Sequence, residues 1–228
     1  MTEASPLFST TRWTLLEESS GPKSSDALDQ LCSNYWRPVH AFLRRSGCPE
    51  ADAQDLTQDF FVTFMGREGF AQAERGKGRF RSFLLSCVRN HFTNAWKAST
   101  RLKRGGGIDF MEVNDELDAS NGLSPDEVFE KRWAEDLVDR ALANLRDEWI
   151  AKDRPFKLLA PYLSGDRGAP QLSETAEKLG VSLAATKSAV HRLRKRFGEL
   201  VKLEVSNSVG SEEDEADELD YLLQLLSM

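Results

Sequence analysis

The chain of 228 residues contains no run of about 18 apolar residues, so we expect no membrane-spanning helix and no membrane partner. Its first residues lack a basic stretch followed by an apolar one, and we therefore expect a cytoplasmic protein that is not exported. Only three cysteines are present, Cys32, Cys48 and Cys87, and they lie far apart. An odd, dispersed set argues against a disulfide framework and fits a reducing compartment.

Sequence motifs of common enzyme classes are missing as well. No GxSxG, Walker loop or HExxH occurs, and the Gly76–Gly78 stretch is too short to cradle a phosphate. The three histidines, His40, His91 and His191, do not stand at metal-ligand spacing with one another or with the cysteines. We therefore expect no enzyme, no metal site and no cofactor.

The net charge of −7 disfavours a nucleic-acid binder, but the charges are unevenly distributed. Eight basic residues and no acidic one lie between Lys77 and Arg104, and a second basic group surrounds His191. Acidic residues concentrate between Glu212 and Asp220. Since charges more than about 8–10 Å apart are screened at physiological salt, the local field decides what a surface attracts. Two separated basic blocks predict two separate contacts with nucleic acid.

Apolar residues recur mostly at helical spacing, and no stretch is typical of a strand, so we predict an all-α fold. The pattern divides into two small helical domains, 8–104 and 128–205, joined by a flexible acidic and glycine-rich linker, 105–127. Ser124 and Pro125 are typical of a helix start. The tail, 206–228, is acidic and then apolar; it either forms a short amphipathic helix on the chain itself or on a partner, or it is solvated.

The segment Gln171–Phe197 predicts a helix-turn-helix, which makes the second domain a DNA-binding one. Gly180 suits a sharp turn with positive φ, Val181 is expected to fill the space between the helices, and Ser182 can cap the next helix. That helix is expected to bury Ala185, Ala189 or Val190, and Leu193. The outward residues expected at base edges are Lys187, Ser188, His191 and Arg192, with Arg194, Lys195 and Arg196 near phosphates. The alternative is an ordinary helical hairpin with a solvated basic face.

A long helix from Phe80 to about Arg101 has the residue types that hold an unpaired strand. Asn90 and Asn94, one helical turn apart, can read base edges, while Arg89, Lys97 and Arg101 can hold phosphates. His91 and Trp96 are candidate stacking groups, because aromatic faces stack on bases at about 1–3 kcal/mol each. The alternative for Trp96 is a place in the core.

These segments resemble a known family. SETAEKLGVSLAATKSAVHRLRKRF resembles region 4 of extracytoplasmic-function (ECF) sigma factors, a subfamily of the sigma-70 family, and DAQDLTQDFFVTF with FRSFLLSCVRNHFTNAWKASTRLKR resembles region 2. The resemblance implies a promoter-recognition subunit in which 128–205 reads the −35 element and 8–104 binds polymerase and opens the −10 element. Its partners are bacterial core RNA polymerase and promoter DNA, and it would be nucleoid-associated when bound to polymerase. An anti-sigma factor or a Ser/Thr kinase would be a further partner.

The polymerase contact implied by the resemblance falls on one predicted helix. Acidic residues there lie three or four positions apart and so share a face, with apolar residues beside them; the set is Asp52, Asp55, Leu56, Asp59 and Phe60. For Asp52 the alternative is a helix N-terminal acid that complements the macrodipole. Gln54 stands where the family commonly has an acid. Phosphorylation of Thr57 or Thr63 would restore charge, adding about −1.5 to −2.

The main rival function is a stand-alone helix-turn-helix regulator that binds operator DNA as a dimer. Such a protein has no need of the acidic helix around Asp55 or of a separate basic, aromatic helix in its other half. Binding to core RNA polymerase therefore distinguishes the two hypotheses.

Overall fold

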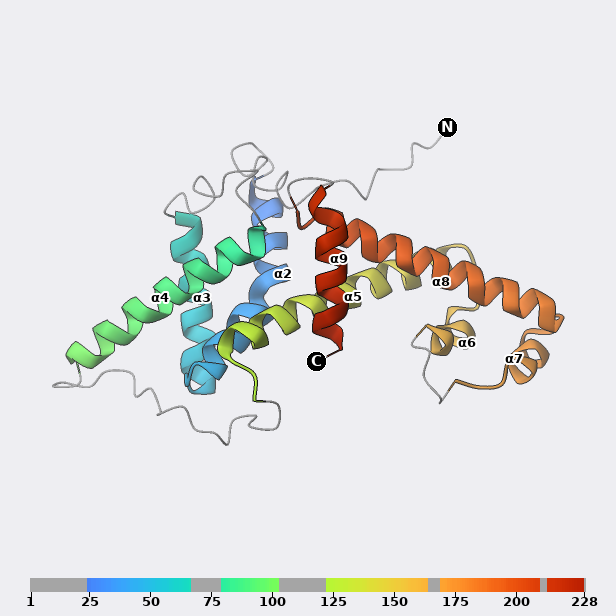
Figure 1. Ribbon diagram of the computed structural model, residues 1–228, viewed down its shortest axis with the longest axis horizontal. Helices are drawn as coiled ribbons and strands as arrows, with labels where there is room; N and C mark the ends of the chain where they lie inside the picture. The colour runs from blue at the N-terminus through green and yellow to red at the C-terminus, as the bar shows by residue number, and fades with distance from the viewer. Residues whose placement is uncertain (1–23, 67–78, 103–121, 164–168, 210–212, 228) are drawn as a thin grey trace. The chain divides into compact units, whose positions relative to one another are not determined.

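The computed structural model describes residues 24–66, 79–102, 122–163, 169–209 and 213–227. These residues form helices and connecting turns and include no strand, which confirms the predicted all-α fold (Figure 1). In chain order the helices are α2 (Ser24–Arg45), α3 (Glu50–Gly66), α4 (Phe80–Leu102), α5 (Pro125–Ala151), α6 (Phe156–Leu159), the 3-10 helix η1 (Ala160–Tyr162), α7 (Leu172–Leu179), α8 (Leu183–Ser206) and α9 (Glu213–Leu226). None of these helices is both long and apolar enough to cross a bilayer.

The chain folds as two compact units, and the division differs from the predicted one. Unit 1 comprises Met1–Asp136 together with Ser206–Met228, and unit 2 comprises Leu137–Val205. The predicted boundary at residue 128 falls inside α5, whose first three turns belong to unit 1 because Phe129 and Trp133 are fully buried there. Residues 105–121, which are most of the predicted linker (105–127), lie outside the described residues.

The core of unit 1 begins with the regular apolar spacing of α2 and α3. On α2 the residues at every fourth position are at most 1% exposed: Leu31, Tyr35, Val39 and Leu43. The helix continues through Pro38 rather than restarting there, since the apolar face on both sides of the proline packs into one core. Gly47, with φ of 94°, makes the turn into α3, a conformation that glycine adopts at no steric cost.

Helix α4 completes this core through an apolar stripe. Phe80, Leu84 and Val88 are at most 1% exposed, and the Phe80 ring meets that of Tyr35 edge-on at 5.5 Å. Helix α5 starts with a capping box in which the Ser124 backbone N–H donates to Glu127 (2.7 Å) and the Glu127 N–H donates to the Ser124 hydroxyl (3.3 Å). The predicted helix start at Ser124 and Pro125 is confirmed.

The tail of the chain forms the last helix of unit 1. Leu222 and Leu225 of α9 are 0% and 3% exposed, so this helix is not a solvated tail. Of the two predictions for the tail, the amphipathic helix on the chain itself is the one that the structure shows. Its inward face carries Leu222 and Leu225 together with one acid, Glu218, while Asp217 and Asp220 are exposed.

Unit 2 has a separate core in which the second part of α5 packs with α8 and the short helices between them. Its buried members are Ala141, Leu145, Trp149, Leu159, Tyr162, Val190, Leu193 and Leu200. Arg140 of α5 pairs with Glu204 of α8 at 3.0 Å. This core holds α7 and the first turns of α8, which carry the predicted helix-turn-helix.

Candidate nucleic-acid interface

The turn of the helix-turn-helix lies between α7 and α8 in unit 2. Gly180 has φ of 65° at the end of α7, and the N–H groups of Gly180 and Val181 donate back to the carbonyls of Glu177 and Ala176 (both 3.1 Å). The Ser182 hydroxyl accepts the N–H of Ala185 (3.2 Å) and so caps α8. The predicted turn glycine and the predicted cap are both confirmed.

Replacing Gly180 by alanine should destabilise unit 2 by about 1–2 kcal/mol, because a Cβ at positive φ is strained. An added Cβ would meet no atom within 4 Å, so backbone strain alone decides the effect. Gly198 is the matched control: it lies within α8, an added Cβ there is also unobstructed, and its φ is not positive. Gly198→Ala should stabilise by up to about 1 kcal/mol, since alanine favours helix over glycine. Urea unfolding measures whether each substitution lowers or raises the free energy of unfolding. A change in the same direction for both variants would contradict this account.

The first turns of α8 pack in a register that differs by one residue from the expected one. Val181 is 47% exposed and does not fill the space between the helices, and Ala185 is exposed rather than buried. Thr186 is instead fully buried, and its hydroxyl donates to the Ser182 carbonyl at 3.2 Å. A threonine can be buried here because its hydroxyl has a backbone partner within its own helix. Val190 and Leu193 are buried as predicted.

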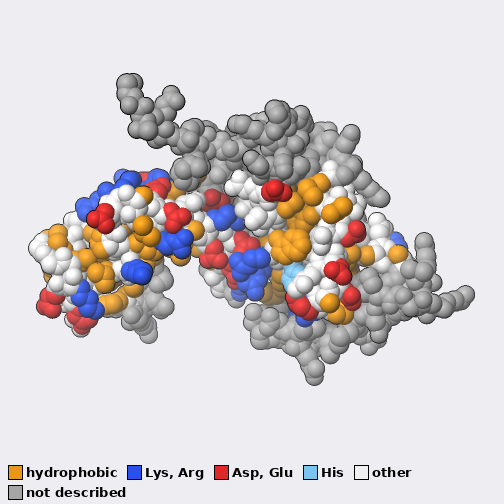
Figure 2. Space-filling view, turned by 180° about the vertical axis from the view of Figure 1, so that it is seen from behind, with side chains coloured by type: hydrophobic (Ala, Val, Ile, Leu, Met, Phe, Trp, Pro, Cys, Tyr) orange, Lys and Arg blue, Asp and Glu red, His pale blue; other side chains and the backbone are white. Residues whose placement is uncertain are grey.

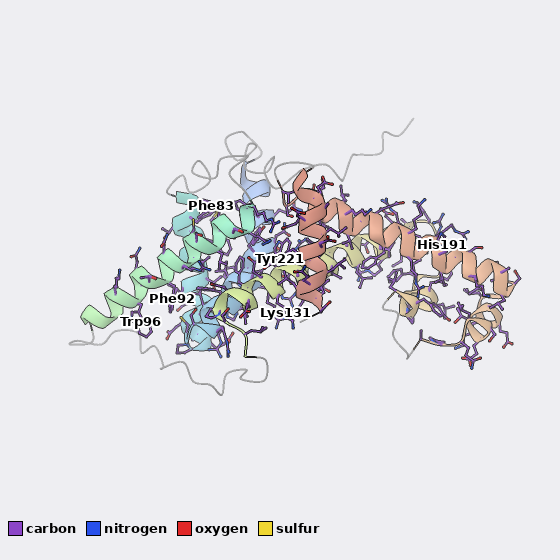
Figure 3. The ribbon with its side chains drawn as sticks, in the orientation of Figure 1. Phe83, Phe92, Trp96, Lys131, His191 and Tyr221 are labelled. Atoms are coloured by element: carbon purple, nitrogen blue, oxygen red, sulfur yellow. The ribbon has the colours of Figure 1, made fainter. Side chains whose placement is uncertain are left out.

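The outward face of α8 carries the predicted base-reading residues. Lys187, Ser188, His191 and Arg192 are all exposed, and their spacing of three and four puts them on one face of the helix. Figure 2 shows Lys and Arg side chains gathered along the upper left edge of the view, over unit 2. His191 is labelled on α8 in Figure 3. Helix α8 thus presents a polar and basic strip along one side.

Three more basic residues were predicted to neutralise phosphates, and the structure separates them. Lys195 is exposed. The Arg194 Nε donates to the Tyr162 carbonyl (2.7 Å), which ties α8 to η1. Arg196 is held by Glu148 of α5 through two hydrogen bonds (2.9 and 2.6 Å) and by Glu199 (3.0 Å), so it is not available as a phosphate contact while these pairs last.

The Arg196–Glu148 pair also has an electrostatic signature. The hydrogen bond from Arg196 lowers the pKa of Glu148 below its ordinary 4.5, and the same bond raises the pKa of Arg196. Because the carboxylate titrates at lower pH in the fold than in the unfolded chain, its stabilising contribution is complete above pH 4.5 and is lost as the pH falls through the folded pKa. Arg196 therefore acts as a structural residue of unit 2.

The second candidate surface is the exposed side of α4 in unit 1. Asn90, Asn94 and Lys97 are exposed, and Trp96 is 37% exposed, so Trp96 is not a core residue. The ring of Phe92 lies next to that of Trp96, at 6.1 Å, and is 6.3 Å from the ring of Phe42 (Figure 3). His91 is half-buried against Phe60 at 5.5 Å and pairs with Asp59, so the structure does not present it for stacking. The side chain of Arg101 lies outside the described residues.

Several arginines just before and along α4 already form ion pairs with acidic side chains. The guanidinium of Arg89 forms two hydrogen bonds to the Asp126 carboxylate of α5, one of them at 2.9 Å. Arg79 and Arg81 both pair with Glu218 of α9 (2.9 and 3.0 Å). This cluster is not among the sites predicted from the sequence, although Glu218 stands on the same helical face as Leu222 and Leu225, where an acid needs a buried partner.

The predicted polymerase-binding residues of α3 separate into exposed acids and buried apolar residues. Asp55 and Asp59 are exposed, and Asp52 is half-buried in the first turn. Leu56 and Phe60 are 7% and 2% exposed, so they are buried in the described chain, and their contact with polymerase stays a prediction. They face inward because they continue the apolar stripe of α3 that packs in the core of unit 1.

The two predicted phosphorylation sites also differ in exposure. Thr57 is fully buried, and its hydroxyl donates to the Ala53 carbonyl at 2.6 Å. A kinase cannot reach this hydroxyl in the described conformation. Thr63 is half-buried. Modification at either residue stays a prediction, with Thr63 the more accessible of the two.

A groove of about 910 Å³ runs beside the acidic side of α3 within unit 1. It is lined by side chains of α2, α3 and the first turns of α5, including Trp36, Gln54, Asp55, Gln58 and Arg132. The Trp36 ring is 37% exposed and stacks on Phe61 at 5.9 Å. An exposed aromatic ring within a charged groove is typical of a protein-binding surface.

Cysteine and metal chemistry do not add a further site in the described part of the chain. Burial raises the pKa of the Cys48 thiol to about 12 and that of Cys32 to about 11, and it also raises that of Cys87, so the three thiols stay protonated. All three are free. Among residues that the structure describes, no three His, Cys, Asp or Glu side chains converge as a metal site.

One comparison with known proteins gives a match, and it falls on unit 1. Residues 31–102, about a third of the chain, match the family model described as Sigma-70 region 2. No curated protein and no solved structure matches the chain significantly. The matched range contains most of α2, all of α3 and α4, and therefore both the acidic face and the exposed Asn90–Lys97 surface. Residues 31–102 are therefore similar to Sigma-70 region 2.

Proposed function

We propose that the chain is a sigma factor of the ECF type, which binds core RNA polymerase in the cytoplasm and directs it to a particular set of promoters. The observation that carries this proposal is the combination of two parts in one chain. The match to Sigma-70 region 2 falls in unit 1, and the predicted helix-turn-helix, with an exposed basic face on α8, falls in unit 2. A role in initiation needs binding surfaces rather than catalytic groups, so the proposal includes no enzymatic step.

Helix α8 is the proposed reader of the upstream, −35 element. Base edges in the major groove are recognised by hydrogen-bonding side chains on the early turns of a recognition helix. Lys187, Ser188, His191 and Arg192 supply such groups on one exposed face, and Lys195 follows as a phosphate contact. The proposed set omits Arg196, because Glu148 and Glu199 already bind its guanidinium.

Helix α4 is the proposed holder of the opened downstream strand. Melting needs a surface that binds unpaired bases better than the duplex holds them. Trp96 offers a partly exposed ring, Asn90 and Asn94 offer exposed amides, and Lys97 adds a positive charge. Stacking at about 1–3 kcal/mol per base is comparable to the stability of one base-pair step, so a few such contacts suffice to favour an open segment.

Core polymerase is proposed to dock on the side of unit 1 where α2 and α3 form the groove. Asp55 and Gln54 line the groove, and Trp36 provides an exposed aromatic anchor. Aromatic anchors surrounded by charged residues carry much of the energy of protein interfaces. An anti-sigma factor that uses the same groove would compete with polymerase, and phosphorylation of Thr63 would add charge on the same helix.

The deciding experiment is in vitro transcription with purified core RNA polymerase and a fragmented genomic library. The proposal expects the chain to bind core polymerase and to start transcription at a defined group of promoters. A chain that binds duplex DNA but fails to bind core polymerase would be the stand-alone regulator instead. Failure of both binding steps would overturn the proposal as a whole.

Arg192→Ala should weaken binding of the best promoter from that library by about 1–3 kcal/mol if Arg192 reads a base. The measurement is affinity for the promoter duplex and for a scrambled duplex at fixed salt. Lys202→Ala, an exposed cation further along α8, is the matched control and should change both affinities little. Equal losses on promoter and scrambled DNA would show a phosphate contact and would reject base reading by Arg192.

A further inference from the structure

A buried carboxylate on α9 connects two parts of unit 1 that are far apart in the sequence, the start of α4 and the tail. Glu218 of α9 is 0% exposed and accepts two hydrogen bonds from Arg81, from Nε and Nη2, each at 3.0 Å. The Nε of Arg79 reaches the same carboxylate at 2.9 Å. Two guanidinium groups at the start of α4 thus converge on one acidic side chain from the end of the chain.

The surroundings of this carboxylate form a built site. The Arg81 guanidinium lies over the Trp133 ring at 4.7 Å and over the Tyr221 ring at 4.5 Å, and it also pairs with Glu130 at 2.8 Å. Arg79 is 31% exposed, whereas Arg81 is 2% exposed, so one cation of the pair borders the solvent and the other is enclosed. Burial raises the pKa of Glu130 and of Tyr221. Tyr221 is labelled in Figure 3.

Guanidiniums that bind a carboxylate through two parallel hydrogen bonds also suit a phosphate, because each anion presents two oxygen atoms at similar spacing to the guanidinium fork. Arg79 directly precedes α4, the helix proposed to hold the opened strand. The Glu218 carboxylate therefore occupies the place that a strand phosphate would take beside that helix. This inference rests on the proposed function of α4.

We propose that the Arg79–Arg81 site is a phosphate site for the promoter strand, and that α9 fills it in the free protein, so that DNA and α9 compete for these two cations. Charge stays balanced in this exchange, because a phosphate replaces the Glu218 carboxylate and Arg81 keeps its ion pair with Glu130. Helix α9 has 14 residues and ends the described chain, and a helix this short is marginal without its packing.

Hydrogen exchange on the unchanged full chain tests the competition directly. A single-stranded oligonucleotide of the promoter's −10 sequence is added at low salt, and protection of α4 and α9 amides is compared with and without it. The proposal expects slower exchange in Asn90–Lys97 and faster exchange in Leu222–Leu226. Protection of α4 with unchanged α9 would overturn this inference and leave the proposed function intact. No effect on α4 would remove the proposed strand contact and this inference with it.

The variant Glu218→Gln gives a second, quantitative test, with Asp217→Asn as its control. Both replace an acid by its amide in the same helix, but Asp217 is exposed. Freeing one or two cations for phosphates should steepen the salt dependence of log K for the oligonucleotide by about 0.7–1.4 relative to the control. A slope equal to that of Asp217→Asn, in a variant whose α2 amides remain protected, would show that the Glu218 contact is structural only.

Discussion

Arg81→Met should lower the free energy of unfolding of unit 1 by about 3–5 kcal/mol, the largest effect of any single substitution considered for this unit. The substitution leaves the carboxylates of Glu130 and Glu218, which are nearly or fully buried, without the guanidinium that both now bind. It also removes the cation between the rings of Trp133 and Tyr221. The loss is measured by urea unfolding, with hydrogen exchange of α2 and α4 used to assign it to unit 1.

Arg132→Met is the control for this substitution. Arg132 pairs with Glu135 one turn away, but its side chain is 46% exposed, and such pairs contribute about 0–1 kcal/mol. Adding Glu218→Gln to Arg81→Met should restore part of the stability, because the stranded charge is then removed; the coupling in this double-mutant cycle should be about 1–3 kcal/mol. Similar small losses for Arg81→Met and Arg132→Met would mean that the buried cluster contributes little to the fold.

Local signals in the sequence predicted the helix-turn-helix well. Gly180 adopts positive φ and Ser182 caps α8 because both choices are set by the backbone of a few neighbouring residues. The packing of α8 was harder to predict. Ala185 and Thr186 are both compatible with a helix interior, and only the contacts with the rest of unit 2 decide that the threonine faces inward.

Predictions that depended on long-range contacts were the ones that the structure corrected. The acids beside Leu56 and Phe60 suggest a binding surface, but both side chains are buried in the core formed by α2, α3 and α4. Arg81 and Glu218 are 137 positions apart, and no local periodicity relates residues so distant. Their pairing also explains why a tail rich in acids becomes part of the N-terminal unit.

The order of elements along the chain has a consequence for the proposed function. The chain enters unit 2 within α5 and returns to unit 1 at the end of α8. The unit that carries the helix-turn-helix is therefore continuous with unit 1 at both of its ends, through helical residues in each case. Unit 2 is thus an insertion in the sequence of unit 1, and the proposed upstream and downstream DNA contacts belong to different units of one chain.

Leu193→Ala should cost unit 2 about 2–5 kcal/mol and should abolish reading of the upstream element. Leu193 is 0% exposed and packs in the cluster that holds α8 against α5, η1 and α6. A unit of about 70 residues, Leu137–Val205, has a total stability of only about 3–10 kcal/mol by the usual value per residue. The cavity left by one leucine therefore removes a large part of the stability of the whole unit.

Comparing which binding activities and which protected amides are lost distinguishes this effect on unit 2 from a general destabilisation of the protein. Leu183→Ala, at an exposed position of the same helix (43% exposed), should change stability by no more than about 0.5 kcal/mol and should leave promoter affinity close to normal. In Leu193→Ala, hydrogen exchange should become fast in α7 and α8 while the amides of α2 and α4 keep their protection. Because α4 then remains folded, binding of a single-stranded −10 oligonucleotide should survive where duplex binding is lost. Loss of both activities together would mean that the two units depend on each other for folding, and the assignment of strand binding to unit 1 alone would have to be abandoned.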